Sequence, residues 1–568
     1  MDIKTDKEYQ DLEQLRKKAL AYYQMNGVPQ IIETALNKMF FSQPNDPFSY
    51  LTQYFTKYLH PPLIEKVSAI EIFDSKGQPT VSAEILINVN GLLKSIGAAS
   101  IASYNQLTDA SLTEKKEADD EERQKSVTAA IEYINGPMST ALKGCLVSEQ
   151  SKIDQILGAV LNQLQQHTET LESPKTTPAP PKDEPKQPVP NKGSAKAAKK
   201  KDAVKTPEAC EAPKEVTFCG AQAVSAVSAA TAIAAATCRS MAPFEYINEL
   251  FCKKTNESFR LPTPMITMLS GGRSVSGKQN LIRELLLIPK PGIPISEVVA
   301  KCKNVFNRLI SDLSRKLGLP SRVISDVGSL SPAFDRPEQL LESLLEACQP
   351  CDVTLGEDFF VGLHCASHEY WDSSKERYEF MTGTFKSSDE LVDSIYSDLI
   401  QRFPFIIAVI DPFVQQDLSA WQRFSELHSH RMWIFGERSL GRPEQILLEA
   451  PKIMTNGGTF QFNQSTSVFD LIDVSRDFKE KEFKTMVTTS LADTTDTFIV
   501  DLAVGIEADF IKIGGFCRGE RTSKYNRLLA ISNDSRCLPP ISKEQWDFKS
   551  LISTDIAEES EESEPVKE

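Results

Sequence analysis

The sequence lacks an excess of basic residues and an apolar segment near its beginning. Lys and Arg number 63 against 78 Asp and Glu, so the formal net charge of the 568 residues is -15. Such a chain is a poor general binder of nucleic acid, because neutralising phosphates requires clustered Lys and Arg. The first residues, MDIKTDKEYQ, are polar and do not resemble a secretory signal segment. We therefore expect a cytoplasmic protein without a nucleic-acid partner.

Large aliphatic residues are also scarce in the one long uncharged stretch, residues 216–238. This stretch consists mainly of Ala, Ser and Thr, whose transfer into lipid is poor. It therefore predicts a buried helix that packs closely through small side chains, and no membrane partner is expected. The 11 cysteines are an odd number in a long chain, which fits a reducing compartment.

The length exceeds what one hydrophobic core supports and predicts two to four domains. Residues 1–60 form the first, a helical module in which Asp46 caps a helix that begins at Pro47. Apolar residues before and after this turn recur at the spacing of one buried helix face. Helices this short bury too little area to be stable alone, so we expect a partner surface.

Residues 65–258 predict an α+β domain. Strands and a turn are expected at 65–108 and helices at 121–166. The domain is interrupted at 168–215, where nine of the chain's 33 prolines accompany many lysines. This composition predicts a disordered insertion, because it cannot bury enough surface to offset its ordering entropy.

Residues 261–552 alternate short apolar runs with helical patterns, which predicts a parallel α/β barrel or sheet. The run 405–410 (FIIAVI) is typical of a strand buried on both faces. The remaining residues, 553–568, form an acidic tail that we expect to be disordered.

Several motifs in these segments resemble the enolase family and follow its order. They are IFDSKGQPTV, LPTPMITMLSGG with RELLLIP, VGLHCASHEYW, IDPFVQQDLSAWQRF, FNQSTSVFD and DTTDTFIVDLAVGIEADFIKIGGFCRGERTSKYNRLL. Together they cover roughly 65–550, apart from the insertion. The added beginning and the interrupted α+β domain are most similar to the divergent, sperm-associated fourth branch of vertebrate enolases. The resemblance implies an enolase-type barrel after an α+β domain.

The resemblance also implies a reaction, the dehydration of 2-phosphoglycerate to phosphoenolpyruvate with magnesium. A lysine base removes a weakly acidic proton while metal ions stabilise the intermediate, and a carboxylic acid protonates the leaving hydroxide. Aligned with the family motifs, Gln461 stands at the base position and Val327 at the acid position. Neither an amide nor an isopropyl group performs these proton transfers.

The resemblance places the family's metal ligands at four positions, of which Ser100 on the lid matches the family. The three carboxylates that hold the first magnesium correspond to His364, Ile410 and Glu437, and a carboxylate remains at Glu437 alone. Magnesium requires oxygen ligands. The family cofactor is therefore doubtful in this chain.

The family's substrate-binding positions are mixed. Glu284 and Lys512 match the family, whereas Thr489 and Ser490 replace its His and its phosphate-binding Arg. The two matching residues have either retained a ligand-binding role or pair with each other as facing charges. A shifted alignment would instead make Lys452 or Lys484 the base, although neither lies in the strand-end motif.

Two further motifs have simpler explanations. GRSVSGK at 272–278 has P-loop spacing, but Gln279 follows where Ser or Thr should bind magnesium. Cys348 and Cys351 form a lone CxxC, which is weak evidence for a metal even with His364, Cys365 and His368 further along the chain. We interpret the first as a family loop and the second as reduced thiols.

The segment VPQIIETALNKMFFSQPNDPFSYLTQYFTKYL resembles the dimerisation-docking fold of protein kinase A regulatory subunits and the Dpy-30 family. In that fold two helical hairpins form a bundle that takes the apolar face of an amphipathic helix. The resemblance implies a dimer, with itself or with another enolase, and docking to an anchoring protein. Alternatively, the helices cap the enolase body.

Two functions remain open for this sequence, so whether it is an enzyme is undecided. One is a phosphopyruvate hydratase, a carbon–oxygen lyase of the sperm glycolytic machinery. The other is a weak or inactive, structural enolase relative that docks in the sperm flagellum or its fibrous sheath. The substituted base, acid and metal positions favour the second.

Overall fold

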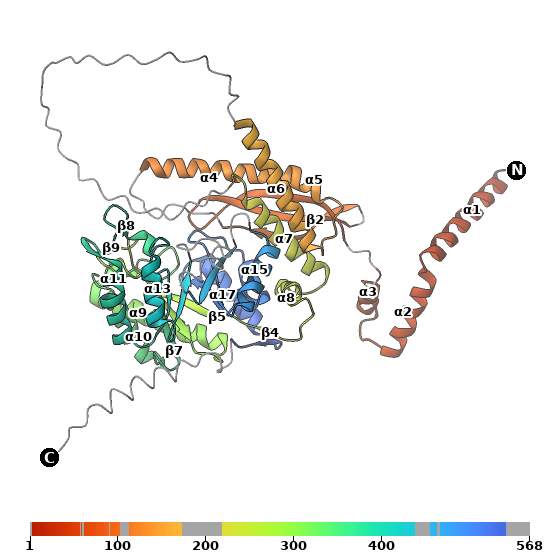
Figure 1. Cartoon of the computed structure of the whole chain (residues 1–568). Coiled ribbons are helices and arrows are strands. Elements are labelled where there is room, and N and C mark those ends of the chain that lie inside the picture. Colours follow the sequence, from red (N-terminus) through yellow and green to blue (C-terminus); the bar gives the residue numbers. More distant parts are fainter. Residues whose placement is uncertain are drawn as a thin grey trace, which may run out of the picture. The chain divides into compact units, whose positions relative to one another are not determined.

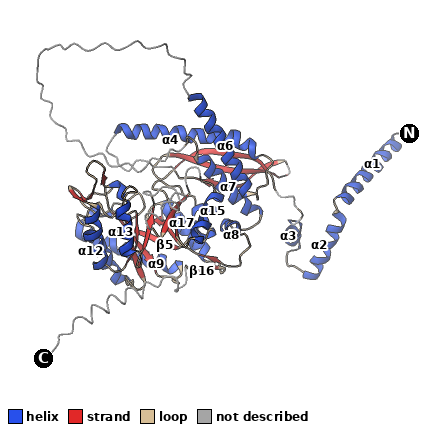
Figure 2. Cartoon of the chain, in the orientation of Figure 1, coloured by secondary structure: helices blue, strands red, loops and turns tan. Residues whose placement is uncertain are grey.

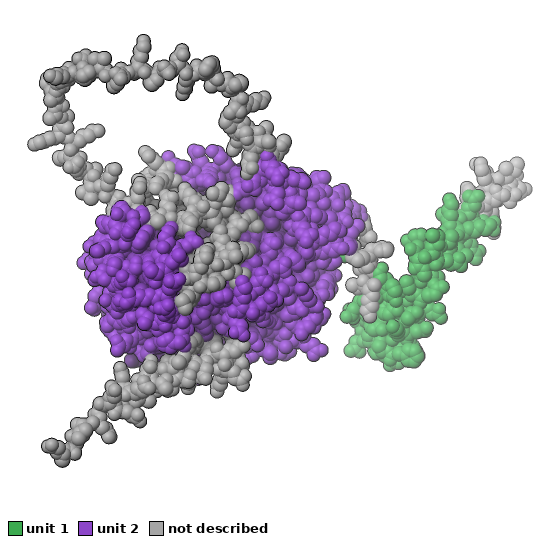
Figure 3. Space-filling model, in the orientation of Figure 1, with its two compact units in different colours: residues 1–62 green, residues 63–568 purple. Residues whose placement is uncertain are grey.

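The computed structural model describes residues 3–56, 58, 62–89, 91–102, 113–172, 218–437, 455–462 and 466–540. The chain divides into two compact units, Met1–Pro62 and Leu63–Glu568 (Figure 3). The predicted tail at 553–568 lies outside the described residues, as does the predicted insertion beyond residue 172.

The first unit consists of helices α1 (Ile3–Met25), α2 (Val28–Ser42) and α3 (Pro47–Thr56). The predicted cap is present, because the Asp46 carboxylate accepts the backbone N–H groups of Phe48 and Ser49 at 3.1 Å. Ala35 and Tyr54 are buried. Larger apolar side chains are exposed on α2 and at the start of α3: Ile32, Leu36, Phe40, Phe41 and Phe48.

The second unit begins with a three-stranded antiparallel sheet in the order β1 (Ile64–Phe73), β2 (Pro79–Val89), β3 (Leu92–Ser100). The turn between β1 and β2 is the predicted one. Asp74 stabilises it by accepting the backbone N–H groups of Lys76 and Gln78. The predicted β-rich segment is therefore confirmed as far as Ser100.

The helices that follow are α4 (Thr113–Tyr133), α5 (Ser139–Leu142), α6 (Gln150–Glu172), α7 (Gln222–Cys238) and α8 (Pro243–Cys252), with a π-helical turn at Ile134–Met138. Of these, α4, α5 and α7 contact the sheet, and α6 and α8 pack on α7 (Figures 1 and 2). The prediction that the insertion starts at residue 168 is wrong by one helical turn, because α6 continues through Glu172. The first proline after α6 is Pro174, and the residue before a proline is disfavoured in a helix.

The predicted buried helix is α7, which contacts β2 and β3 of the sheet. A Cβ atom on Gly97 of β3 would lie 2.4 Å from the Ala230 carbonyl oxygen. Small residues on both elements therefore permit the close approach. In the part of the chain that the structure describes, no single helix is long and apolar enough to span a bilayer. The pair α7 and α8 reaches the required length and composition together, with a bend of 101°.

The rest of the unit is the predicted barrel, closed by eight strands in the order β11-β12-β13-β14-β15-β5-β6-β7. Neighbouring strands are parallel, except that β6 runs antiparallel to β5 and β7. The strand bounds are β5 (Thr263–Ser270), β6 (Glu284–Pro289), β7 (Phe359–His364), β11 (Ile406–Ile410), β12 (Trp433–Gly436), β13 (Gly457–Gln461), β14 (Lys484–Thr488) and β15 (Phe510–Gly514).

The described barrel helices are α9 (Ile295–Leu317), α10 (Glu338–Cys348), α11 (Ser388–Glu390), α12 (Ser397–Arg402), α13 (Leu418–His428), α15 (Val468–Glu480), α16 (Phe498–Gly505) and α17 (Gly519–Ser532). Short strands flank the barrel: β4 (Phe259–Arg260), β8 (Trp371–Asp372), β9 (Arg377–Met381), β10 (Thr384–Lys386) and β16 (Cys537–Leu538). β11 is buried throughout, as the run FIIAVI predicts. Apolar side chains from the strands fill the barrel interior.

Candidate functional site

The antiparallel strand β6 determines which residues meet at the barrel mouth. Parallel strands place their last residues at this end, and functional groups in barrels of this kind gather there. Because β6 runs the other way, it contributes its first residue, Glu284, which pairs in register with His364 at the end of β7. The next strand, β11, brings Ile410 into register with His364.

The other side of the mouth follows the same rule. Glu437 comes directly after β12, and Gln461 is the last residue of β13. Thr488 ends β14 and pairs with Lys512 of β15. Charged residues from β6, β12 and β15, far apart in the sequence, therefore meet in one place.

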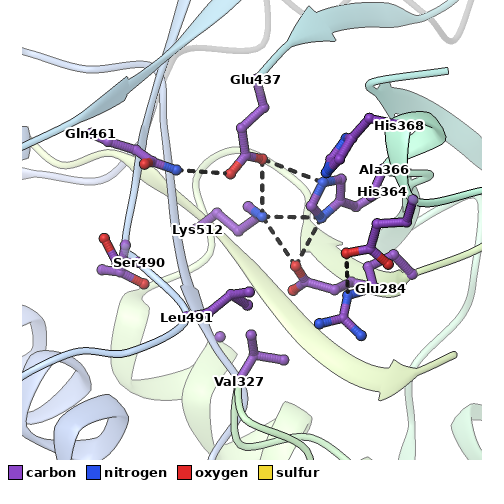
Figure 4. A pocket seen from close by; sticks show the side chains of 14 residues that line it. Glu284, Val327, His364, Ala366, His368, Glu437, Gln461, Ser490, Leu491 and Lys512 are labelled. Carbon is purple, nitrogen blue, oxygen red and sulfur yellow. Dashed lines mark hydrogen bonds and ion pairs between the residues drawn. The ribbon is translucent and has the colours of Figure 1, made fainter. Parts of the chain in front are cut away.

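These residues line a pocket that contains eight of the ten predicted site positions: Glu284, Val327, His364, Glu437, Gln461, Thr489, Ser490 and Lys512 (Figure 4). The other two lie elsewhere. Ile410 is fully buried in the apolar interior of the barrel. Ser100 borders a neighbouring pocket with Thr488 and Asp496, and its hydroxyl bonds Ser82 at 3.1 Å.

A buried cluster of four side chains occupies the floor of the pocket (Figure 4). The Lys512 Nζ lies 3.2 Å from a carboxylate oxygen of Glu284 and 3.2 Å from one of Glu437. The His364 Nδ1 is 2.8 Å from the same Glu284 oxygen, and its Nε2 is 3.5 Å from the same Glu437 oxygen. Glu284 and Lys512 therefore form a buried ion pair in this structure.

The remaining carboxylate oxygens of the cluster also have partners. Thr267 donates its hydroxyl to the second oxygen of Glu284 at 2.7 Å. Gln461 donates its amide N–H to the second oxygen of Glu437 at 3.1 Å, and the Thr488 hydroxyl lies 3.5 Å from that oxygen. Three of the four carboxylate oxygens thus accept hydrogen bonds, whereas the Glu437 oxygen that faces Lys512 has the ammonium at 3.2 Å as an ion-pair partner without a hydrogen bond.

The pKa values of the cluster reflect this pairing. Burial alone would raise the pKa of Glu284, but the Lys512 ammonium and the His364 ring outweigh it and hold this pKa well below its usual value. The pKa of Glu437 is lowered for the same reasons. Burial would lower the pKa of Lys512, and the two glutamates instead raise it. All three groups are therefore ionised near neutral pH.

The opposite side of the pocket is apolar. Val327 and Leu491 lie across Lys512 from Glu437 (Figure 4). The Val327 backbone is held by the Gly515 N–H, which donates to its carbonyl at 2.7 Å. The loop at the predicted acid position is thus in place, although its side chain has no proton to give.

Arg521 of α17 holds the loop that carries Thr489 and Ser490, and no motif in the sequence predicts this role. It is fully buried, and its guanidinium donates to the Thr489 hydroxyl at 2.7 Å and to the Ser490 carbonyl at 2.8 Å. Arg283, another pocket residue that was missed, pairs with Glu369 at 3.5 Å. Arg283 is the first residue of the RELLLIP motif, next to Glu284, and this position could have predicted that it lies at the pocket.

The donor set at the mouth does not fit a magnesium ion. The two glutamates are bridged by Lys512, the third ligand is an imidazole nitrogen, and Ile410 has no donor atom. Among the described residues, no group of three or more His, Cys, Asp or Glu side chains could hold a metal as they stand. Cys348 and Cys351, which are among these residues, belong to no such group, and burial raises the pKa values of both thiols.

Comparison with known families assigns both parts of the second unit. A model described as "Enolase, N-terminal domain" matches residues 64–166, and one described as "Enolase, C-terminal TIM barrel domain" matches residues 258–536. Enolase 4 of Xenopus laevis is 32% identical over 541 residues, covering 92% of both chains. Enolase 4 of Mus musculus is 33% identical over 558 residues, covering 92% of this chain and 90% of the relative.

Bacterial relatives are more distant. An enolase of Lactobacillus helveticus (strain DPC 4571) is 26% identical over 476 residues, covering 83% of this chain and 95% of the relative. The similarity therefore extends over the sheet domain and the barrel together, in agreement with the architecture described above.

Proposed function

The chain belongs to the enolase family, and from this premise we propose that it no longer carries out the family reaction. We propose that the barrel serves as a structural body and that the helical unit serves for assembly and docking. The reaction that we propose has been lost is the dehydration of 2-phosphoglycerate.

The observation that carries the proposal is the position of Lys512. Its ammonium bridges Glu284 and Glu437 at 3.2 Å to each, in a cluster that is almost completely buried. Carboxylates that are paired in this way are not free to bind a metal. The ammonium between them has no free charge to offer a substrate. Breaking a buried pair of this kind costs several kcal/mol, so substrate binding would have to supply that energy first.

The proton-transfer positions support the same conclusion. Removing a proton next to a carboxylate requires a base with a suitable pKa, and expelling hydroxide requires an acid. Gln461 donates to Glu437 instead, and Val327 has no ionisable group. Loss of several cooperating groups leaves little of an enzyme's rate, because such groups act as a unit.

The family is generally magnesium-dependent, and we propose that this member is not. The ammonium neutralises the glutamates that a divalent ion would need. The imidazole of His364 also suits transition ions better than the hard magnesium ion.

A direct assay tests the loss of catalysis. Purified full-length protein is incubated with 2-phosphoglycerate and Mg²⁺, and phosphoenolpyruvate formation is followed by its ultraviolet absorbance, with an active enolase as positive control. We expect a rate at least about 10⁴-fold below that control. Turnover within about tenfold of the control would refute the proposal and support the phosphopyruvate hydratase alternative.

For the helical unit we propose dimerisation followed by docking of an amphipathic helix. Phe40, Phe41 and Phe48 are 70%, 84% and 81% exposed on helices that bury little else. Apolar side chains gathered on a small helical unit indicate an interaction surface. A bundle of two hairpins would cover part of these side chains and offer the rest to a partner helix.

Light scattering after size-exclusion chromatography tests this assembly in the full chain. We expect Phe48→Ser to shift the protein toward monomer, whereas Gln53→Ser, at an exposed polar position of the same helix, leaves the mass unchanged. A dimer that survives Phe48→Ser together with Phe40→Ser would assign dimerisation to the enolase body. Mixing with an active enolase tests heterodimers in the same experiment.

The proposed location is the cytoplasm, in particular the sperm flagellum and its fibrous sheath, and it follows from the resemblance to the sperm-associated branch. Immunostaining of sperm and other tissues tests it. Signal confined to the flagellum supports docking at an anchoring structure, whereas uniform staining of many tissues argues against it.

A further inference from the structure

Helix α1 carries an apolar stripe along its second half. Every side chain from Glu13 to Asn26 is exposed, and α1 extends away from α2 and α3 (Figure 1). Leu15, Ala19 and Tyr23 (the α1 stripe) recur at every fourth position, which places them on one face of the helix. The opposite face is polar and includes Glu13, Gln14, Lys17 and Gln24. Helices in proteins gain most of their stability by packing such an apolar face, so the α1 stripe needs a surface to cover it.

Helix α2 exposes a second stripe with the same spacing. Ile32, Leu36 and Phe40 (the α2 stripe) are 43%, 47% and 70% exposed. Ala35, the buried residue of α2, is offset from Leu36 by about 100° around the helix axis. The α2 stripe is therefore a different face from the one that the helical unit buries. It includes Phe40, which belongs to the docking surface proposed above.

The two stripes lie at equal distances along the chain from the junction of the helices. Because α1 ends at Met25 and α2 begins at Val28, Asn26 and Gly27 form the connection. Counted outward from this junction, the stripes match as three pairs: Tyr23 with Ile32, Ala19 with Leu36, and Leu15 with Phe40. Connections of this length join the antiparallel helices of αα-hairpins. Gly27 has a φ of 62°, a conformation that favours glycine and lets the chain turn sharply.

We propose that α1 closes about Gly27 and packs its stripe against the α2 stripe of the same chain, covering the surface that a docking helix would use. In the closed arrangement Ala19 lies at the centre, opposite Leu36, where a small side chain faces a large one. A docking helix has to displace α1, because both need the side chains of the α2 stripe. This regulatory role rests on the docking function proposed above, whereas the closure itself does not.

The short connection favours closure within one chain over binding of a separate helix. A segment tethered by a short linker is present at an effective concentration on the order of millimolar. The apparent affinity for a docking helix is then reduced by the fraction of open molecules, so a chain that is about 90% closed binds about tenfold more weakly. Residues 3–25 thus set a threshold that a docking partner has to exceed.

Hydrogen–deuterium exchange of the full-length protein, measured by mass spectrometry, tests the closure. Ala19→Asp places a charge in the contact and should speed the exchange of amides 15–23 by at least about tenfold relative to wild type. Ala21→Asp makes the same chemical change on the opposite face of α1 and should stay within about threefold of wild type. Equal effects of the two substitutions overturn the proposal, because the α1 stripe is then uncovered.

A reciprocal substitution identifies the surface that α1 covers. Leu36→Asp in the α2 stripe should release amides 15–23 as Ala19→Asp does. Thr34→Asp is the control, because Thr34 is exposed on another side of α2. If α1 stays protected in Leu36→Asp, it packs on a different surface and the proposal is wrong. Protection that appears at about 50 μM but not at about 1 μM protein overturns it as well, because α1 then packs on a second copy.

The fluorescence of anilinonaphthalene sulfonate, a dye that binds exposed apolar surface, tests whether closure covers the α2 stripe. Deleting residues 1–25 should raise the fluorescence of the bound dye at least about twofold, and the same deletion combined with Leu36→Asp should not. A decrease overturns the proposal, because deleting an open α1 removes an exposed stripe. Exchange and dye binding report closure whether or not a docking partner exists. A closed α1 in a chain that captures no helix therefore refutes docking and leaves the closure standing.

Discussion

Gln461 donates its amide to Glu437, so the residue at the predicted base position takes part in the buried cluster. A lysine there would place a second ammonium near Lys512. Repulsion between the two ammonium groups would lower their pKa values, whereas Glu284 and Glu437 would raise them. Pairing with these carboxylates is therefore what opposes formation of the neutral amine that a base must be.

We therefore predict that Gln461→Lys alone does not create enolase activity. The substitution restores one basic group, but Val327 still has no proton to donate and Lys512 still fills the cation position. Phosphoenolpyruvate formation should remain within about tenfold of the wild-type background. A gain of about a thousandfold or more would show that the base was the one missing group.

At the scale of elements, the junction of α6, α7 and α15 joins the sheet domain to the barrel through a buried carboxylate. Asp154 of α6 accepts the backbone N–H of Phe469 in α15 at 3.0 Å, and Gln150 donates to both of its oxygens. Burial raises the pKa of Asp154 to about 6, against the lowering effect of these hydrogen bonds and of Ser228.

This raised pKa predicts how stability varies with pH. Between about pH 4 and pH 6 the folded protein holds a proton on Asp154 that the unfolded chain has lost, so the group's contribution to stability falls as pH rises. Relative to Asp154→Asn, the wild type should lose about 2 kcal/mol of unfolding free energy from pH 4 to pH 6.5. Urea unfolding at a series of pH values measures this, and a constant difference would contradict it.

The packing of α7 on β3 gives a second prediction at this scale. Gly97→Ala introduces a methyl group 2.4 Å from the Ala230 carbonyl oxygen and 2.5 Å from the Ala234 nitrogen. Because both contacts are to backbone atoms, we expect a loss of about 1–3 kcal/mol in unfolding free energy.

Gly158→Ala is the matched control for this substitution. Gly158 lies within α6 and has open space around the position of a Cβ atom. Alanine there should stabilise the helix by up to about 1 kcal/mol. If both substitutions change the unfolding free energy equally in denaturant unfolding, the close contact between Gly97 and α7 does not restrict the side chain at position 97.

At the scale of the whole molecule, the two compact units predict separable functions. Deletion of residues 1–62 should leave the melting temperature of the remaining chain within about 2 °C of the full-length value, because the enolase body has its own core. The same deletion should abolish capture of an amphipathic anchoring helix in a pull-down. Unchanged capture by the shortened chain would assign docking to the enolase body.

Much of the fold could be predicted from the sequence, because the motifs lie at strand ends whose order the barrel preserves. The substituted positions Gln461, Val327 and His364 could likewise be located from local motifs. The structure adds what depends on neighbours in space. The bridge by Lys512 requires β6, β12 and β15 to meet, and the closed order of strands decides this.

Other features could not be found because their signal is not local. Arg521 lies in α17, and it holds a loop that precedes it by about thirty residues. Ile410 and Ser100 occupy family positions but lie outside the pocket. The motifs thus predicted where the strands lie in the sequence. They did not predict which side chains line the same pocket.

A counter-ion that is part of the chain cannot be diluted or chelated away. Dialysis against EDTA, or a rise in citrate or nucleotide that withdraws free magnesium, leaves the Lys512 ammonium where it is, between Glu284 and Glu437. Under the proposed function, the integrity of this barrel does not depend on the cell's supply of divalent ions. Such independence suits a permanent component of an assembly better than a catalyst that must exchange its cofactor.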